Sequence, residues 1–168
     1  MTSRRQLPPL DHLRERLEYN PCTGNLIWKN GQRAGHVAGT ITTSGYVQIM
    51  MCGYGYRAHR LIWLIHYGEV PSGDIDHING DRSDNRISNL RDVAHGENLK
   101  NSRLPKHNTS GLVGVMKWRG GWRAQASVNG KIIHLGCYKS KEDAAAARAR
   151  ADKLFGFHPN HGRIQRGY

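Results

Sequence analysis

A polar stretch near the middle of the chain constrains the fold more than any other segment. It runs from Asp76 to Asn98 and reads DHINGDRSDNRISNLRDVAHGEN. The run Asn79-Gly80-Asp81 favours a turn, residues 90–93 suit a short return strand, and residues 95–102 have the length of a helix. The pattern predicts a strand, an ordered loop, a second strand and a helix, with Asp76 on the first strand facing Asn98 on the helix.

The residues at the ends of this stretch suit metal and proton chemistry. The Asp76 carboxylate and the Asn98 amide each offer oxygen, which a hard divalent cation such as Mg²⁺ prefers. His77 is expected on the other strand face or at the strand end, where it need not bind the metal and can accept a proton from water. Ala94 offers no capping oxygen, so packing must hold the helix that follows it. The alternative is a His- and Asn-rich turn region that binds nothing.

Four positions in the stretch resemble the HNH motif of nucleases, most of all that of small phage and intron-encoded homing endonucleases. The positions lie in Asp76-His77, in Ser88-Asn89-Leu90-Arg91 and in Glu97-Asn98. The resemblance implies that Asp76 and Asn98 bind one divalent cation, Mg²⁺ or Mn²⁺. It also implies that His77 activates the attacking water, while Asn89 braces the loop and orients His77 through a backbone contact.

An excess of positive charge points to a polyanionic partner. The chain of 168 residues carries a net charge of +12 at pH 7, with a pI near 10.1. Residues 105–168 hold twelve Lys and Arg against three acids, so +9 of that charge lies there and +3 lies in residues 1–104. Nucleic acid is the first candidate. The sequence shows no long apolar run and no Lys-rich amphipathic helix, so we expect no membrane association.

The cysteines argue against a zinc site of the kind that some HNH proteins carry. Cys22, Cys52 and Cys137 lie far apart and form no CxxC pair. We expect small buried or incidental thiols, no structural zinc, and a cytoplasmic protein that is not secreted.

The segment before the motif reads as a helix followed by strands. Leu10, Leu13 and Leu17 fall at helical spacing behind Asp11, a plausible N-cap. Residues 35–56 are rich in Gly, Thr, Tyr and Val with turn signals, which predicts several short antiparallel strands.

An apolar run just before the motif predicts a helix over residues 58–66 that ends near Gly68. Its His-Arg-Leu-x-Trp pattern resembles the helix that precedes the nuclease motif in the phage enzymes. We expect His59 to have a structural role that buttresses the site, and Arg60 to reach a DNA phosphate. The core-facing residues are predicted to be Leu61, Ile62, Leu64 and Ile65. Four basic residues line either a DNA-facing surface or a solvated strand face: Lys29, Arg33, His36 and Arg57.

The C-terminal residues predict a small sheet followed by a helix. Residues 103–111 are polar, which predicts a linker. Arg119-Gly120-Gly121 and Asn129-Gly130 favour turns between strands, the second being a strong hairpin signal. The three strand-like runs lie at residues 113–117, 122–128 and 131–135.

Ser140 to Asp143 opens the helix with a capping-box-like start. Its predicted inner face consists of Ala144, Ala147, Ala151, Leu154 and Phe155. Its predicted outer face carries Arg148, Arg150 and Lys153.

Three strands followed by an alanine-rich helix resemble the AP2 DNA-binding domain. The matching runs are Gly114-Val115, Gly121-Trp122-Arg123-Ala124, His134-Leu135-Gly136 and Glu142-Asp143-Ala144-Ala145. The resemblance implies that the outer face of the sheet lies in the major groove, with arginine binding guanine and Gln125 suited to adenine. Trp118 is either DNA-facing or a rim residue, and Trp122 belongs to the core. By position, the DNA-facing candidates are Lys117, Arg119, Arg123, Gln125, Lys131 and His134.

Together these observations predict an α+β protein of two domains. Residues 1–104 would form an HNH endonuclease domain whose ββα-metal core spans about residues 70–104, and residues 105–168 an AP2-like DNA-binding domain. The predicted activity is metal-dependent hydrolysis of a phosphodiester bond in double-stranded DNA, by a nicking or site-preferring enzyme of the homing type. We expect a monomer with no small-molecule cofactor. The alternative is a non-catalytic, sequence-specific DNA-binding regulator with a relic nuclease fold, against which the intact motif argues.

Overall fold

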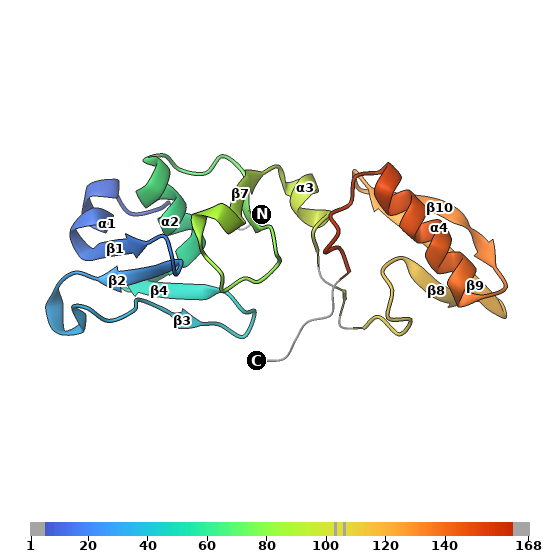
Figure 1. Cartoon of the computed structure of the whole chain (residues 1–168), viewed down its shortest axis with the longest axis horizontal. Coiled ribbons are helices and arrows are strands. Elements are labelled where there is room, and N and C mark those ends of the chain that lie inside the picture. Colours follow the sequence, from blue (N-terminus) through green and yellow to red (C-terminus); the bar gives the residue numbers. More distant parts are fainter. Residues whose placement is uncertain (1–5, 103, 106, 163–168) are drawn as a thin grey trace. The chain divides into compact units, whose positions relative to one another are not determined.

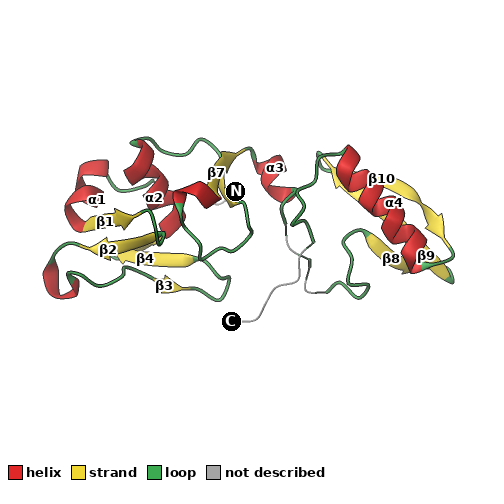
Figure 2. Ribbon diagram, in the orientation of Figure 1, coloured by secondary structure: helices red, strands yellow, loops and turns green. Residues whose placement is uncertain are grey.

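The chain folds into two compact units of mixed helices and small antiparallel sheets (Figure 2). The computed structural model describes residues 6–102, 104–105 and 107–162, so residues 103 and 106 of the predicted linker lie outside the described residues. The first unit is Met1–Ala94 and the second His95–Tyr168. The predicted domain boundary at 104/105 therefore falls inside the second unit. None of the described helices is long and apolar enough to cross a membrane.

The first unit contains three small sheets and two α-helices among its described residues (Figure 1). Its sheets are the hairpin β1–β2, the three-stranded sheet β3–β4–β5 and the hairpin β6–β7, all antiparallel. The short strands expected between residues 35 and 56 are confirmed as β3, β4 and most of β5. The element bounds are α1 Leu10–Arg16, β1 Leu17–Asn20, β2 Asn25–Trp28, η1 Gly31–Arg33, β3 Thr40–Ile41, β4 Val47–Met51, β5 Tyr54–Arg57, α2 Ala58–Tyr67, β6 Asp74–His77, η2 Ile87–Asn89 and β7 Leu90–Val93.

The N-terminal helix is shorter than its leucine spacing predicts. It ends at Arg16, and Leu17 begins β1, where it pairs with Trp28. Pro9 precedes the first helical residue and Asp11 lies inside the first turn, so the predicted N-cap is wrong. Pairing in the hairpin buries Leu17 almost completely, and this tertiary contact overrides the helical periodicity.

The core of the first unit gathers around α2, which packs against α1, β1, β4 and β5. The helix ends as predicted at Gly68, whose left-handed φ of 78° lets its N–H donate to the Leu64 oxygen at 2.9 Å. Ile65, predicted to be in the core, is only partly buried. The largest fully buried side chains of the unit are Leu13, Leu17, Leu26, Ile49, Leu61 and Ile62.

The second unit consists of one short helix, a three-stranded sheet in the order β10–β9–β8, and a long helix. The Asn129-Gly130 hairpin is confirmed, with φ of 51° and 76° at the two residues. The first helix stops at Leu99 instead of residue 102, and residues 100–102 continue it as tighter turns whose N–H groups donate to oxygens three residues back. The bounds are α3 His95–Leu99, β8 Val115–Trp118, β9 Gly121–Val128, β10 Lys131–Tyr138 and α4 Lys141–Leu154.

The long helix α4 begins where the sequence predicts. The Ser140 hydroxyl accepts a hydrogen bond from the Asp143 N–H at 3.1 Å, which caps the first turn. Ala144 and Ala147 pack on Val115 and Ala124 of the sheet. Two predictions about its faces are wrong: Leu154 is 79% exposed at the helix end, whereas Arg148 is only 5% exposed.

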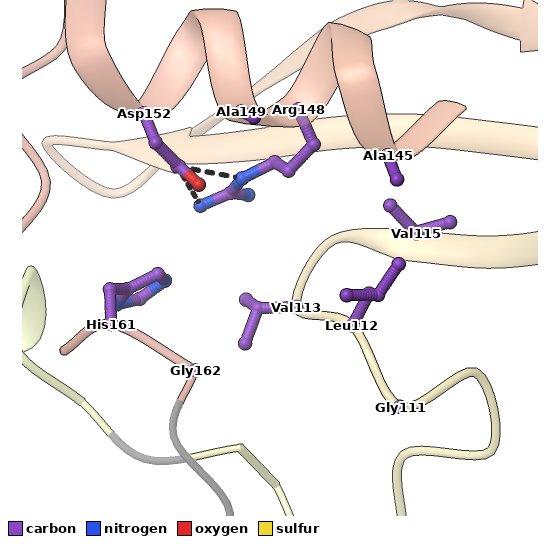
Figure 3. Close-up of a pocket in the computed structure, with 10 residues that line it drawn as sticks. All are labelled: Gly111, Leu112, Val113, Val115, Ala145, Arg148, Ala149, Asp152, His161 and Gly162. Atoms are coloured by element: carbon purple, nitrogen blue, oxygen red, sulfur yellow. Dashed lines mark hydrogen bonds and ion pairs between the residues drawn. The ribbon is translucent and has the colours of Figure 1, made fainter. Parts of the chain in front are cut away.

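Arg148 is buried, and several groups of the second unit bind its guanidinium; Figure 3 shows the contacts with Asp152. Nη1 donates to the Gln125 oxygen at 2.6 Å, and Nη2 lies 2.7 Å from Asp152 Oδ1. The guanidinium also covers the Phe157 ring at 4.8 Å. Gly114, at a φ of +70°, leaves space for the guanidinium, because a Cβ there would collide with Arg148 Nη1. The charged side chain therefore ties α4 to the sheet.

Candidate active site

The short hairpin β6–β7 holds the first two motif residues. Asp76 pairs with Arg91 in the register and His77 pairs with Leu90. Successive residues of a strand point to opposite faces, so the Asp76 carboxylate and the His77 ring point in different directions. Asp76 is 6% exposed and His77 is 3% exposed.

The Asp76 carboxylate forms an ion pair with Arg91. Arg91 Nε and Nη2 donate to Asp76 Oδ2 at 3.0 and 2.7 Å. No role was predicted for Arg91 beyond its place in the motif. Its position opposite Asp76 follows only from the strand register, which places the two side chains on one face of the hairpin.

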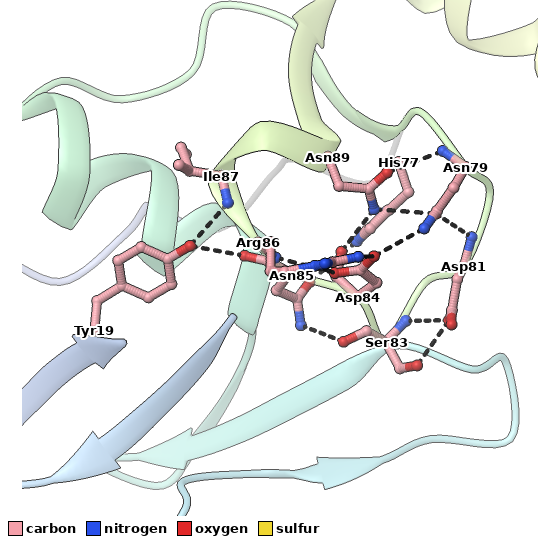
Figure 4. Close-up of polar contacts among 10 residues, drawn as sticks. All are labelled: Tyr19, His77, Asn79, Asp81, Ser83, Asp84, Asn85, Arg86, Ile87 and Asn89. Carbon is pink, nitrogen blue, oxygen red and sulfur yellow. Dashed lines mark hydrogen bonds and ion pairs between the residues drawn. The ribbon is translucent and has the colours of Figure 1, made fainter. Parts of the chain in front are cut away.

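Asn89 braces the loop that follows His77 (Figure 4). Its side-chain oxygen accepts from the Asn79 backbone N–H at 2.9 Å, and its Nδ2 donates to Asn79 Oδ1 at 3.0 Å and to the Asp84 backbone oxygen at 2.8 Å. The backbone oxygen of Asn89 accepts from the Ile78 N–H at 2.9 Å. The contact with Ile78 constrains the backbone directly beside His77, in line with the bracing expected from the resemblance.

The acidic residues of the loop are engaged in holding its shape. Asp84 accepts hydrogen bonds from Arg86 at 2.7 and 2.8 Å and from Asn79 Nδ2 at 2.8 Å. The Arg86 contact is the main reason that the pKa of Asp84 lies below its ordinary value. Asp81 Oδ1 accepts from both the backbone N–H and the hydroxyl of Ser83. The loop between the two strands is therefore an ordered structure.

His77 is surrounded by polar and aromatic side chains. Its Nε2 is 3.0 Å from Asn85 Oδ1, and its ring lies 5.1 Å from the His59 ring at an interplanar angle of 88°. Tyr46 is 6.0 Å away, centroid to centroid. Burial lowers the pKa of His77 below its ordinary value, and the Asn85 hydrogen bond and the charge of Asp76 only partly oppose this.

His59 is buried next to His77. Burial lowers its pKa well below the ordinary value, and the nearby His77, Arg60 and Arg57 lower it further. Its Nδ1 is buried without a hydrogen-bond partner among the described residues. The geometry suits the structural, buttressing role that the sequence predicts for His59, and this role remains a prediction.

Two half-buried arginines lie beside Tyr46, next to the histidine pair. The guanidinium carbons of Arg57 and Arg82 lie 4.7 and 4.6 Å from the centroid of the Tyr46 ring. Arg57 donates to Thr42 Oγ1 at 3.1 Å and Arg82 to the Ser44 oxygen at 3.0 Å. Neither has a carboxylate partner within the described ranges. Arg82 and Asn85 both belong to residues 76–98, yet no role was predicted for either of them from the sequence.

The two predicted metal ligands lie in different units. Asp76 lies on β6 in the first unit, and Asn98 lies on α3 in the second. Among residues 6–102, 104–105 and 107–162 there is no group of three or more His, Cys, Asp or Glu that could hold a metal ion. All three cysteines are free and exposed, which excludes buried thiols and leaves the other expectation, incidental thiols.

The predicted DNA-facing residues of the second unit divide between the two faces of its sheet. Gln125 pairs with His134, and both lie on the face opposite α4, as does Arg123. Lys117 has the same parity as the buried Val115 and lies 6.0 Å from the Trp122 ring. Lys131, opposite Val128, also has the helix-side parity. Arg119 lies in the turn after β8.

An exposed tryptophan lies among these basic residues. Trp118 is 39% exposed, and the Arg123 guanidinium lies 3.4 Å from its ring centroid. Arg119 lies 5.6 Å from the same ring. Trp122, by contrast, is half-buried against the core of the unit, as predicted.

The comparisons with known proteins agree with the motif. Residues 56–100 match the family described as HNH endonuclease, a segment that runs from within β5 to just past α3. A curated relative, Protein 3.8 of Escherichia phage T7, is 40% identical over 78 residues, which cover 45% of this chain and 64% of the relative. The chain thus spans less than two thirds of the length of that relative. No solved structure matches.

The segment that is similar to the HNH endonuclease family is therefore residues 56–100. It contains Asp76, His77, Asn89 and Asn98. The matched segment ends before β8, so the AP2-like resemblance of the C-terminal strands stays a prediction.

Proposed function

We propose that this chain is a metal-dependent DNA endonuclease that hydrolyses a phosphodiester bond in double-stranded DNA. The observation that carries the proposal is a buried histidine, His77, at the end of β6. It lies beside Asp76 and before a loop braced by Asn89, inside the segment that matches the HNH endonuclease family. The finer proposal is a nicking or site-preferring enzyme of the homing type.

In the proposed mechanism His77 is the general base. Only a neutral imidazole can take a proton from water, and burial lowers the pKa of His77, so the ring is neutral at neutral pH. The water that gives up its proton attacks the phosphorus, and the bond to the 3′ oxygen breaks. Asn89 serves this step indirectly, because it holds the backbone next to His77.

We further propose that Asp76 and Asn98 hold one divalent cation, Mg²⁺ or Mn²⁺. The donor set fits a hard cation, since it offers carboxylate and amide oxygens, and Arg91 orients the Asp76 carboxylate through two hydrogen bonds. When bound, such a cation neutralises the negative charge that develops on the phosphate in the transition state.

Positive charge beside His77 would hold the DNA strand. Arg57 and Arg82 have no carboxylate partner among the described residues and are half-buried, so their guanidinium groups are fixed in place. A guanidinium in such a setting suits a phosphate oxygen. Arg60, whose Nη1 donates to the Gly73 oxygen at 3.4 Å, remains a proposed phosphate contact.

The second unit is proposed to bind duplex DNA in the manner of an AP2-like domain. The sheet face opposite α4 presents Arg123, Gln125 and His134, beside the exposed Trp118. Arginine and glutamine side chains are suited to bases in the major groove. Lys117, Arg119 and Lys131 would contact phosphates at the rim instead of bases.

The test is incubation of the purified chain with supercoiled plasmid in Mg²⁺, in Mn²⁺ and in excess chelator. We expect relaxed or linear plasmid with either metal and none with chelator. Cleavage that persists in chelator would refute the metal-dependent mechanism. Binding without cleavage under every condition would identify the chain as a non-catalytic DNA-binding protein.

A further inference from the structure

We propose that Asn85 is a positioning residue that holds His77 in the tautomer with its proton on Nε2, so that Nδ1 is the nitrogen that accepts the proton of the attacking water. The inference rests on the role proposed above for His77. Asn85 Oδ1 lies 3.0 Å from His77 Nε2. Both residues are buried, with 2% and 3% of their surfaces exposed. Buried polar atoms are nearly always hydrogen-bonded, so this short contact is read as a hydrogen bond between Asn85 Oδ1 and His77 Nε2.

The orientation of the Asn85 amide follows from its second contact. Asn85 Nδ2 donates to the Ser83 backbone oxygen at 3.2 Å. In the flipped orientation the amide oxygen would face that carbonyl oxygen, and two acceptors would oppose each other in a buried site. Oδ1 therefore faces His77. Because Oδ1 can only accept, the ring nitrogen opposite it must carry the hydrogen.

The backbone around Asn85 is held by a distant part of the first unit (Figure 4). The Tyr19 hydroxyl donates to the Asn85 backbone oxygen at 3.2 Å and accepts from the Ile87 N–H at 2.8 Å. Gly24 lies so close to the loop that a Cβ there would be 2.5 Å from the Arg86 nitrogen. These contacts restrict the position of Asn85 along the loop, and with it the position of the acceptor that faces His77.

The choice of tautomer matters because the two nitrogens of a neutral imidazole have opposite roles. One nitrogen carries the hydrogen and donates, and the other accepts. A hydrogen-bond acceptor placed beside one nitrogen keeps the hydrogen there, so the opposite nitrogen is the basic one. A side chain that fixes Nε2–H raises the population of the form that can receive a proton at Nδ1. Mutation of a residue that hydrogen-bonds the other ring nitrogen of a metal-binding histidine typically lowers activity by about 10–100-fold. We expect an effect of that order when Asn85 is replaced.

The direct test is long-range ¹H–¹⁵N NMR of the full chain at mildly alkaline pH, where the ring-nitrogen shifts of His77 report the site of the proton. We expect a protonated Nε2 and an unprotonated Nδ1 in the wild type. Asn85→Leu, which removes the acceptor, should give averaged shifts of mixed tautomers, whereas Asn85→Asp should preserve the wild-type pattern. Asn25→Leu makes the same change at an exposed asparagine of β2, so it is the matched control and should preserve the pattern as well.

Single-turnover cleavage and DNA binding complete the test. Asn85→Leu should cut on the order of 10–100-fold more slowly with unchanged DNA affinity, and Asn85→Asp should retain more activity than Asn85→Leu. A proton on Nδ1 of the wild type would overturn the inference and needs no variant to be observed. Equal turnover in Asn85→Leu and wild type would overturn it too. Absence of cleavage by the wild type in every metal would instead overturn the function proposed for His77, which the NMR result does not depend on.

Discussion

Replacing His59 by leucine should make the stability of the first unit less sensitive to acid. The folded unit keeps His59 neutral, because burial lowers its pKa well below the ordinary value of 6.5. The unfolded chain has no such restraint and takes up a proton near pH 6.5. Below that pH the unfolded state binds more protons than the folded state, so acid destabilises the folded unit and the lost stability returns as the pH rises.

The size of the effect follows from proton linkage. A site that is protonated only in the unfolded state changes the free energy of unfolding by at most about 1.4 kcal/mol per pH unit. Between about pH 6.5 and 5.5 a single histidine contributes roughly 1 kcal/mol. The neighbouring His77, whose pKa burial also lowers, acts in the same direction. The wild type should therefore lose more stability in acid than His59→Leu, which keeps only the contribution of His77.

The assay is urea unfolding at a series of pH values, followed through the amide NMR signals of Ile49 and Leu61 in the core of the first unit. Subtracting the variant curve from the wild-type curve cancels the contribution of other titrating groups. His36→Gln is the control, since it removes an imidazole that is exposed. Parallel wild-type and His59→Leu curves between about pH 7 and 5.5 would refute a buried, neutral His59.

Three further predictions test the site and the second unit. His77→Ala should lose on the order of 10²–10⁴-fold in turnover while DNA binding persists, and unchanged turnover would mean that another group accepts the proton. Arg148→Met should destabilise the second unit by about 2–3 kcal/mol, because the groups it binds are left without their donor; an unchanged urea midpoint for that unit would contradict this. Arg119→Gln, at a proposed phosphate contact, should weaken DNA binding and flatten the slope of log affinity against log salt by about 0.9, whereas Arg150→Gln, on exposed α4 surface, should leave the slope as in the wild type.

Signals that act over a few residues were predicted correctly. Gly68 ends α2, Asn129-Gly130 turns the hairpin, and Ser140 caps α4, because each depends on a local backbone conformation or a hydrogen bond within one turn. The strand that ends with Asp76 and His77 was predicted for the same reason, from the turn residues on either side of it.

Features that depend on tertiary contacts were missed. Leu17 was predicted in the helix but lies in β1. Its pairing partner Trp28 is eleven residues further along the chain, beyond the reach of a local helical pattern. Arg148 was predicted outside because an arginine in an alanine-rich helix usually remains in solvent, and the space left by Gly114 cannot be seen in the sequence. In the site, the Arg91 contact required the strand register and the Asn85 contact required the loop conformation.

The motif could be transferred to another protein only together with the N-terminal residues that pack on it and hold its loop. Residues 56–100 bury Leu61 and Ile62 against Leu13 and Leu26, which precede the matched segment, and Tyr19 fixes the loop from the same N-terminal region. A segment of that size rarely buries enough apolar surface to fold alone. Residues 56–100 are therefore not an independent folding unit. A graft into another protein that omits the N-terminal strands would carry the residues of the site without the contacts that shape it.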